Sequence, residues 1–178
     1  INPAQYYHST VSHVRTPAAP LVFGGIRESV AAARGIAQSS LQRLGAEKIL
    51  RYHAAGGRPD YGRTHWENHA NGLTAPVLAD ALRAAAFCGD RELIDQALAA
   101  LRAQERYRNG VPRGAQTWEI PLHTPDILAS AHLVNAFVLG YELTGERQFL
   151  DEAVYWAWTG VPFVYLVNPT GKPVGVYS

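Results

Sequence analysis

The stretch GDRELIDQAL at residues 89–98 returns as GERQFLDEAV at residues 145–154, an offset of 56 residues. Each copy opens with a Gly-acid pair, typical of a turn between helices, and continues with apolar residues at helical spacing. Four positions are identical in the two copies: Gly89, Arg91, Asp95 and Ala97 match Gly145, Arg147, Asp151 and Ala153. The repeat predicts a chain built from similar antiparallel helix hairpins.

Helical periodicity extends outward from the repeat in both directions. It predicts helices over residues 26–44, 47–55, 71–87, 91–107, 125–143 and 146–159. For the fifth of these, Thr124 is the expected N-cap and Pro125 the expected first helical residue. Residues 1–25, with three prolines and two glycines, are expected to form an extended lead-in. Residues 26–178 are then an all-α domain of about three hairpins.

Composition excludes several classes of function. The net charge is +1 and the basic residues are scattered singly, so neither nucleic acid nor an anionic membrane surface is an expected partner. A single cysteine rules out a disulfide framework. No apolar run approaches the ~18 residues that a membrane span needs.

The same composition gives hints about the source. Arginine outnumbers lysine by fourteen to two and alanine is abundant, which suggests a GC-rich bacterial genome. The chain begins at Ile1 and contains no methionine, so we expect a processed product or a piece of a longer protein. Secretion or a periplasmic location therefore stays open, although no signal peptide is visible.

Two loops before predicted helices, residues 58–69 and 108–124, each carry a Trp-Glu pair, Trp66-Glu67 and Trp118-Glu119. In these aromatic-acid loops and the Gly-acid turns, the sequence resembles the α/α-toroid families of carbohydrate-active enzymes, the six-hairpin glycosidases and related polysaccharide lyases. The resemblance covers about residues 26–165. It implies half of a six-hairpin ring, so the remainder of the toroid or another chain is expected to cover the exposed hairpin edges.

In such a ring, the loops that enter the inner helices gather on one rim and line a central funnel. Glycoside hydrolysis needs two carboxyl groups flanking one bond, and the favoured function is a glycoside hydrolase acting on an oligosaccharide or polysaccharide. Recurrence of Trp-Glu in both loops favours a structural role, whereas residues unique to one loop are better candidates for chemistry. The expected catalytic residues are Glu67, Glu119, Asp126 and His69, and the expected substrate-binding residues are Tyr61, Trp66, Asn68, Trp118 and His123.

Three alternatives remain open at this stage. A polysaccharide lyase needs a His or Tyr base and an Asn, His or Arg to neutralise a uronate carboxylate, and Asn68-His69 with Tyr61 supplies those types. A non-catalytic helical-repeat scaffold would bind a protein or a glycan. The spacing His65-x-Glu67-x-His69 permits a metal site, but histidines near helix ends more often serve as hydrogen-bonding residues. No metal or cofactor is therefore expected.

Overall fold

The computed structural model describes residues 24–54, 67–117 and 121–164. The described part is all-α, as predicted, with isolated bridges in place of strands. Its elements are α2 (Ile26–Leu44), α3 (Asn71–Cys88), α4 (Arg91–Arg102), the 3-10 helix η2 (Ala103–Tyr107), α5 (Ile127–Thr144), α6 (Arg147–Gly160) and the 3-10 helix η3 (Val161–Phe163). The lead-in predicted for residues 1–25 falls almost entirely outside the described residues.

The two Gly-acid turns of the repeat both end a helix. Gly89 closes α3 with φ +66° and Gly145 closes α5 with φ +71°, a left-handed conformation that glycine adopts without strain. Asp90 then caps α4, because its side chain accepts hydrogen bonds from the backbone N–H groups of Glu92 and Leu93. The helix α5 begins 56 residues after α3, and α6 begins 56 residues after α4, so the helices follow the offset of the sequence repeat.

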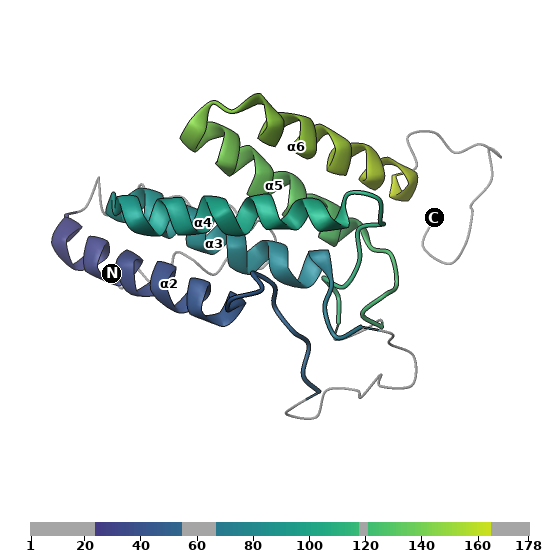
Figure 1. Cartoon of the computed structure of the whole chain (residues 1–178), viewed down its shortest axis with the longest axis horizontal. Coiled ribbons are helices and arrows are strands. Elements are labelled where there is room, and N and C mark those ends of the chain that lie inside the picture. The colour runs from purple at the N-terminus through teal and green to yellow at the C-terminus, as the bar shows by residue number, and fades with distance from the viewer. Residues whose placement is uncertain (1–23, 55–66, 118–120, 165–178) are drawn as a thin grey trace.

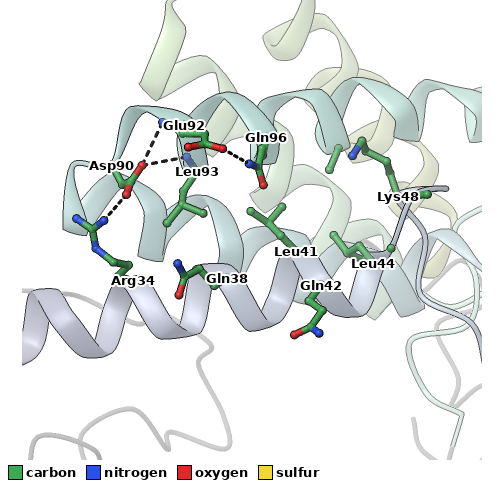
Figure 2. Close-up of a pocket in the computed structure, with 13 residues that line it drawn as sticks. Arg34, Gln38, Leu41, Gln42, Leu44, Lys48, Asp90, Glu92, Leu93 and Gln96 are labelled. Carbon is green, nitrogen blue, oxygen red and sulfur yellow. Dashed lines mark hydrogen bonds and ion pairs between the residues drawn. The ribbon is translucent and has the colours of Figure 1, made fainter.

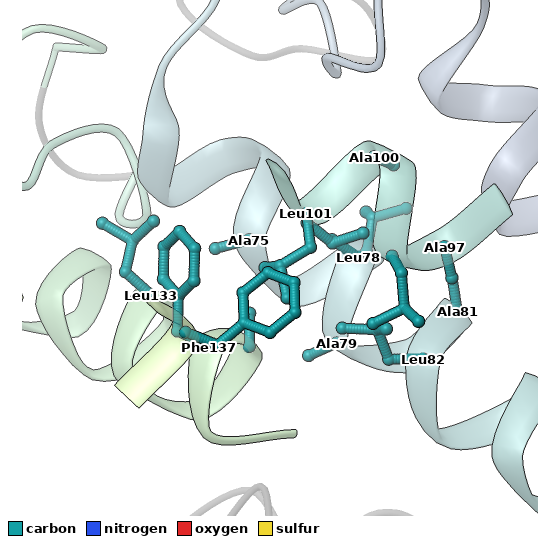
Figure 3. Packing of buried hydrophobic residues seen from close by; sticks show 14 of the residues in the cluster. Ala75, Leu78, Ala79, Ala81, Leu82, Ala97, Ala100, Leu101, Leu133 and Phe137 are labelled. Atoms are coloured by element: carbon teal, nitrogen blue, oxygen red, sulfur yellow. The ribbon is translucent and has the colours of Figure 1, made fainter. Parts of the chain in front are cut away.

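The helices α2, α3, α5 and α6 lie side by side in that order, and α4 crosses one face of α3 (Figure 1). Their shared core draws on α3, α4, α5 and α6, and includes Leu78, Leu82, Leu101, Leu133 and Phe137 (Figure 3). Trp156 of α6 is fully buried in the same core. Burial of these side chains from several helices supplies the main free energy of folding.

Two sequence predictions about element boundaries are wrong. Residues 47–54 form no helix: Lys48 has φ +60°, and the chain then runs beside the start of α3, where Leu50 N–H donates to Thr74 Oγ1 at 3.1 Å. Thr124 and Pro125 do not start α5. The N-cap is Asp126, whose carboxylate accepts the N–H of Ala129 at 2.7 Å and so satisfies a free donor of the first turn.

Helix α5 is long and apolar enough to cross a membrane by length and composition alone, contrary to the expectation that no segment would be. Its 18 residues have a mean hydropathy of 1.3 and include one charged side chain, Glu142. Core helices of globular proteins pass the same test, and α5 packs against both α3 and α6.

Candidate active site

The loops before α3 and α5 are tied together through their backbones. Within the loop before α3, Arg51 forms an antiparallel bridge with His69, and within the loop before α5, Arg113 forms one with Pro125. Gly72 N–H donates to the carbonyl of Arg113 at 2.9 Å, and a Cβ on Gly72 would lie 2.6 Å from that oxygen. Glycine at position 72 therefore allows the two loops to approach closely, which brings their side chains into one cluster.

Arg113 is the centre of this cluster. Its side chain is almost completely buried, and its Nε donates to Nδ1 of His123 at 2.9 Å. Its Nη2 donates to Oε2 of Glu67 at 3.3 Å, and the guanidinium lies 5.8 Å from the centre of the Tyr107 ring. A planar guanidinium with several donors can hold all these groups in fixed positions. We call Glu67, His69, Tyr107, Arg113 and His123 the loop cluster.

His69 and Tyr107 form the closest polar pair in the loop cluster. Nδ1 of His69 lies 2.7 Å from the Tyr107 hydroxyl, and Nε2 lies 3.7 Å from Oε2 of Glu67. Burial lowers the pKa of His69 below 6.5, and Arg51, Arg113 and Arg106 lower it further against the opposing charge of Glu67. Burial raises the pKa of Tyr107 to about 12. At neutral pH the imidazole is therefore neutral and the phenol protonated.

His123, a predicted substrate-binding residue, has both ring nitrogens engaged. Because Arg113 Nε can only donate, Nδ1 of His123 is the acceptor, and Nε2 carries the proton that it donates to the carbonyl of Glu67 at 3.0 Å. The histidine thus holds the backbone that carries Glu67. Asn68, also predicted to bind substrate, accepts a hydrogen bond from Nη1 of Arg51 at 2.5 Å through Oδ1.

Asp126, a predicted catalytic residue, has both carboxylate oxygens engaged by backbone. Oδ1 accepts from Ala129 N–H and Oδ2 accepts from Ala115 N–H at 3.0 Å, and the residue is 4% exposed. The carboxylate therefore begins α5 and fixes the loop before it. In contrast, the side chain of Glu67 is 43% exposed and can reach a bound molecule.

Several predicted residues lie outside the described part of the chain: Glu119, Tyr61, Trp66 and Trp118. His65, a member of the possible metal-binding spacing, does so too. Among residues 24–54, 67–117 and 121–164, no group of three His, Cys, Asp or Glu side chains is arranged to hold a metal ion.

Sequence reasoning missed Arg113 and Tyr107, two of the five members of the loop cluster. Tyr107 ends a helical stretch and looked like an ordinary helix residue, because its partner His69 is 38 residues away. Arg113 stands between Pro112 and Gly114 in a loop, and Gly114 has φ +80°. An arginine enclosed by two turn residues was the one available signal, since such a segment holds its backbone rigidly.

A groove lies away from the loop cluster, between α2 and α4 (Figure 2). This groove has a volume of about 690 Å³ and is lined by leucines and by polar side chains such as Gln38, Gln42 and Gln96. The ion pair of Arg34 with Asp90, at 2.5 Å, stands at its edge. None of its lining residues belongs to the loop cluster.

Comparisons of this chain with protein-family models, curated proteins and solved structures find no match. The functional argument therefore rests on the residues and their geometry.

Proposed function

We propose that this chain is part of a carbohydrate-active enzyme with the α/α-toroid architecture, and that the loop cluster is its acid–base centre. The reaction that the described geometry supports best is β-elimination from a uronate-containing polysaccharide. The observation that carries this proposal is the neutral His69 beside the protonated Tyr107 and the cation Arg113.

The chemistry of β-elimination matches these three side chains. A base removes the proton next to the uronate carboxylate, the C–O bond to the leaving sugar breaks, and a carbon–carbon double bond forms. In this proposal the proton of His69 is on Nδ1 and directed at the Tyr107 oxygen 2.7 Å away, so Nε2 has a free lone pair and acts as the base. The resulting imidazolium returns the proton to the leaving oxygen, which balances the reaction.

Arg113 and Glu67 have complementary roles in this proposal. Arg113 neutralises the carboxylate of the substrate, which makes the neighbouring proton more acidic. Glu67 is within 3.7 Å of His69 Nε2 and 3.3 Å of Arg113, so it stabilises the imidazolium formed during the reaction and fills the anion site when substrate is absent.

A glycoside hydrolase is the second candidate, because Glu67 has the exposure that a catalytic carboxylate needs. Hydrolysis also needs a second carboxyl group about 5–10 Å away. Asp126 is a poor partner since backbone N–H groups engage both of its oxygens. The partner would then be Glu119, the other predicted acid.

The partly uncovered face of α5 supports the toroid part of the proposal. Ile127 and Tyr141 of that helix are 42% and 37% exposed, although the helix is strongly apolar. A further hairpin of the ring, or another chain, would cover this face. A non-catalytic scaffold would need the same cover but no acid–base centre.

Incubation with uronate polymers and with neutral polysaccharides tests the proposal. Elimination leaves an unsaturated sugar that absorbs ultraviolet light, whereas hydrolysis yields new reducing ends without that absorbance. We expect both signals from uronate polymers and their loss in the variant His69→Gln, with Gln96→Ala in the distant groove as a control that keeps full activity. Reducing ends alone would favour the hydrolase, and no cleavage of any polymer would favour the scaffold.

A further inference from the structure

The segment that carries Tyr107 is a 3-10 helix, and its two sides contact different parts of the molecule. With three residues per turn, side chains three apart share one edge. Along one edge, Arg102, Glu105 and Arg108 all contact α6 or its N-cap residue: they pair with Glu146 (the N-cap), Gln148 and Glu152 respectively. The segment η2 and its flanks therefore bridge α6 and the loop cluster.

The opposite side of η2 contacts the loops before α3. Gln104 Nε2 donates to the carbonyl of Lys48 at 2.8 Å, Arg106 Nη2 donates to the carbonyl of Glu47 at 3.1 Å, and Tyr107 meets His69. The position of the Tyr107 hydroxyl consequently depends on how η2 is held against α6.

Among the three contacts with α6, the pair of Arg108 with Glu152 differs from the others. The side chain of Glu152 is 1% exposed and that of Glu146 is 42% exposed, while the arginine of each pair is about half exposed. Arg108 also lies over the ring of Tyr155, 5.2 Å from its centre, so its guanidinium is held from two sides. A buried carboxylate that loses its cation is strongly destabilised, which makes this contact hard to break.

We propose that Glu152 is a positioning residue, which anchors Arg108 and thereby holds the adjacent Tyr107 against His69. The expected effect on activity rests on the proposed function, but the placement of Tyr107 against His69 by Glu152 and Arg108 does not. Glu152 touches neither His69 nor any group expected to contact substrate. It acts through the backbone of residues 107–108.

Burial raises the pKa of Glu152, and the charge of Arg108 opposes that shift. The variant Glu152→Gln keeps the shape of the side chain and removes the negative charge that holds Arg108. The variant Arg108→Lys keeps the positive charge but loses the planar group that lies on Tyr155. These two variants weaken the anchor from opposite ends.

The test combines nuclear magnetic resonance of His69 with kinetics on the full chain. In Glu152→Gln and Arg108→Lys we expect the pKa of His69 to rise toward 6.5, because a displaced Tyr107 leaves the imidazole less buried. We expect kcat on a uronate polymer to fall by up to about 100-fold with little change in KM, since misplacement of a catalytic group costs turnover more than binding. Glu146→Gln, which removes the surface pair at the other end of the segment, should change neither.

The two readouts separate the two proposals. If the wild-type chain cleaves no uronate polymer but the pKa of His69 changes in Glu152→Gln, the proposed lyase function is wrong and the positioning role of Glu152 is supported. If cleavage is normal and neither variant moves the pKa or kcat, the anchor is wrong. An equal shift in Glu146→Gln would also overturn it, since any loosening of the segment would then suffice. Should Glu152→Gln fail to fold, Arg108→Lys decides the question.

Discussion

Helices α3 and α5 have the same length and begin 56 residues apart, yet their surroundings differ. α3 lies between α2 and α5 with α4 across it, whereas α5 lies between α3 and α6. Five positions along one stripe of α3 are buried to 1% exposure or less: Asn71, Ala75, Leu78, Leu82 and Ala85. The corresponding positions of α5 are partly or largely exposed: Ile127, Ala131, Val134, Val138 and Tyr141.

The difference shows that burial in this chain depends on neighbours rather than on composition. α5 carries one charged residue, Glu142, and α3 carries two, Asp80 and Arg83, so the more apolar helix is the less covered one. Apolar surface of this kind marks a contact site when it is contiguous. The comparison therefore supports the proposal that a further hairpin or another chain covers α5.

The largest expected effect comes from truncating the same side chain in the two helices. Leu82→Ala in α3 should lower the free energy of unfolding by about 2–5 kcal/mol, because it opens a cavity in the closed core. Leu128→Ala in α5, at a partly exposed position, should cost about 1 kcal/mol or less. Urea titration measures both, and equal losses would show that α3 and α5 are equally enclosed.

A polar substitution should also lower stability more on the buried stripe of α3 than on the exposed stripe of α5. Ala85→Ser buries a hydroxyl among apolar side chains and should cost about 1–3 kcal/mol. Ala131→Ser, at an exposed position of the corresponding stripe of α5, should change stability by no more than about 0.5 kcal/mol. If a longer form of the protein covers α5, the cost of Ala131→Ser should rise in that form. Thermal unfolding of the two forms gives the comparison.

At one matched position we expect the substitution in α5 to be the costly one. Gly140 of α5 corresponds to Ala84 of α3, and a Cβ on Gly140 would collide with Leu101 and lie 3.2 Å from Cγ of Phe149. Gly140→Ala should therefore lower stability by about 1–2 kcal/mol despite its better helix propensity. The double variant Gly140→Ala with Leu101→Ala should show a smaller cost than the sum of the two single changes. Strict additivity would mean that this close approach is absent in solution.

The smallest expected effect is a dependence of stability on pH that arises from His69, in the loop before α3. The pKa of His69 is 6.5 in the unfolded chain and lower in the folded one, so the unfolded state binds more protons between those two values. Stability should rise with pH across that window and level off above it. Urea midpoints at several pH values measure the slope, and His69→Gln should reduce it.

The helices were predictable because their signals are local. Glycine turns and apolar stripes located α2 to α6 within a few residues, whereas the helix proposed at 47–55 failed since tertiary contacts of Ile49 and Tyr52 hold that segment extended. The loop cluster was only half predictable. His69, Glu67 and His123 stood out by residue type, but Tyr107 and Arg113 gain their importance from partners that are far away in the sequence.

The protonation of His69 in the folded chain tests the central claim most directly. Nitrogen-15 chemical shifts of the imidazole, followed across pH, report both its pKa and which nitrogen carries the proton. We predict a pKa below 6.5 and, in the neutral form, a proton on Nδ1 with Nε2 free to act as the base. A pKa at or above 6.5, or a neutral ring protonated on Nε2, would contradict the assignment of His69 as the base of this site.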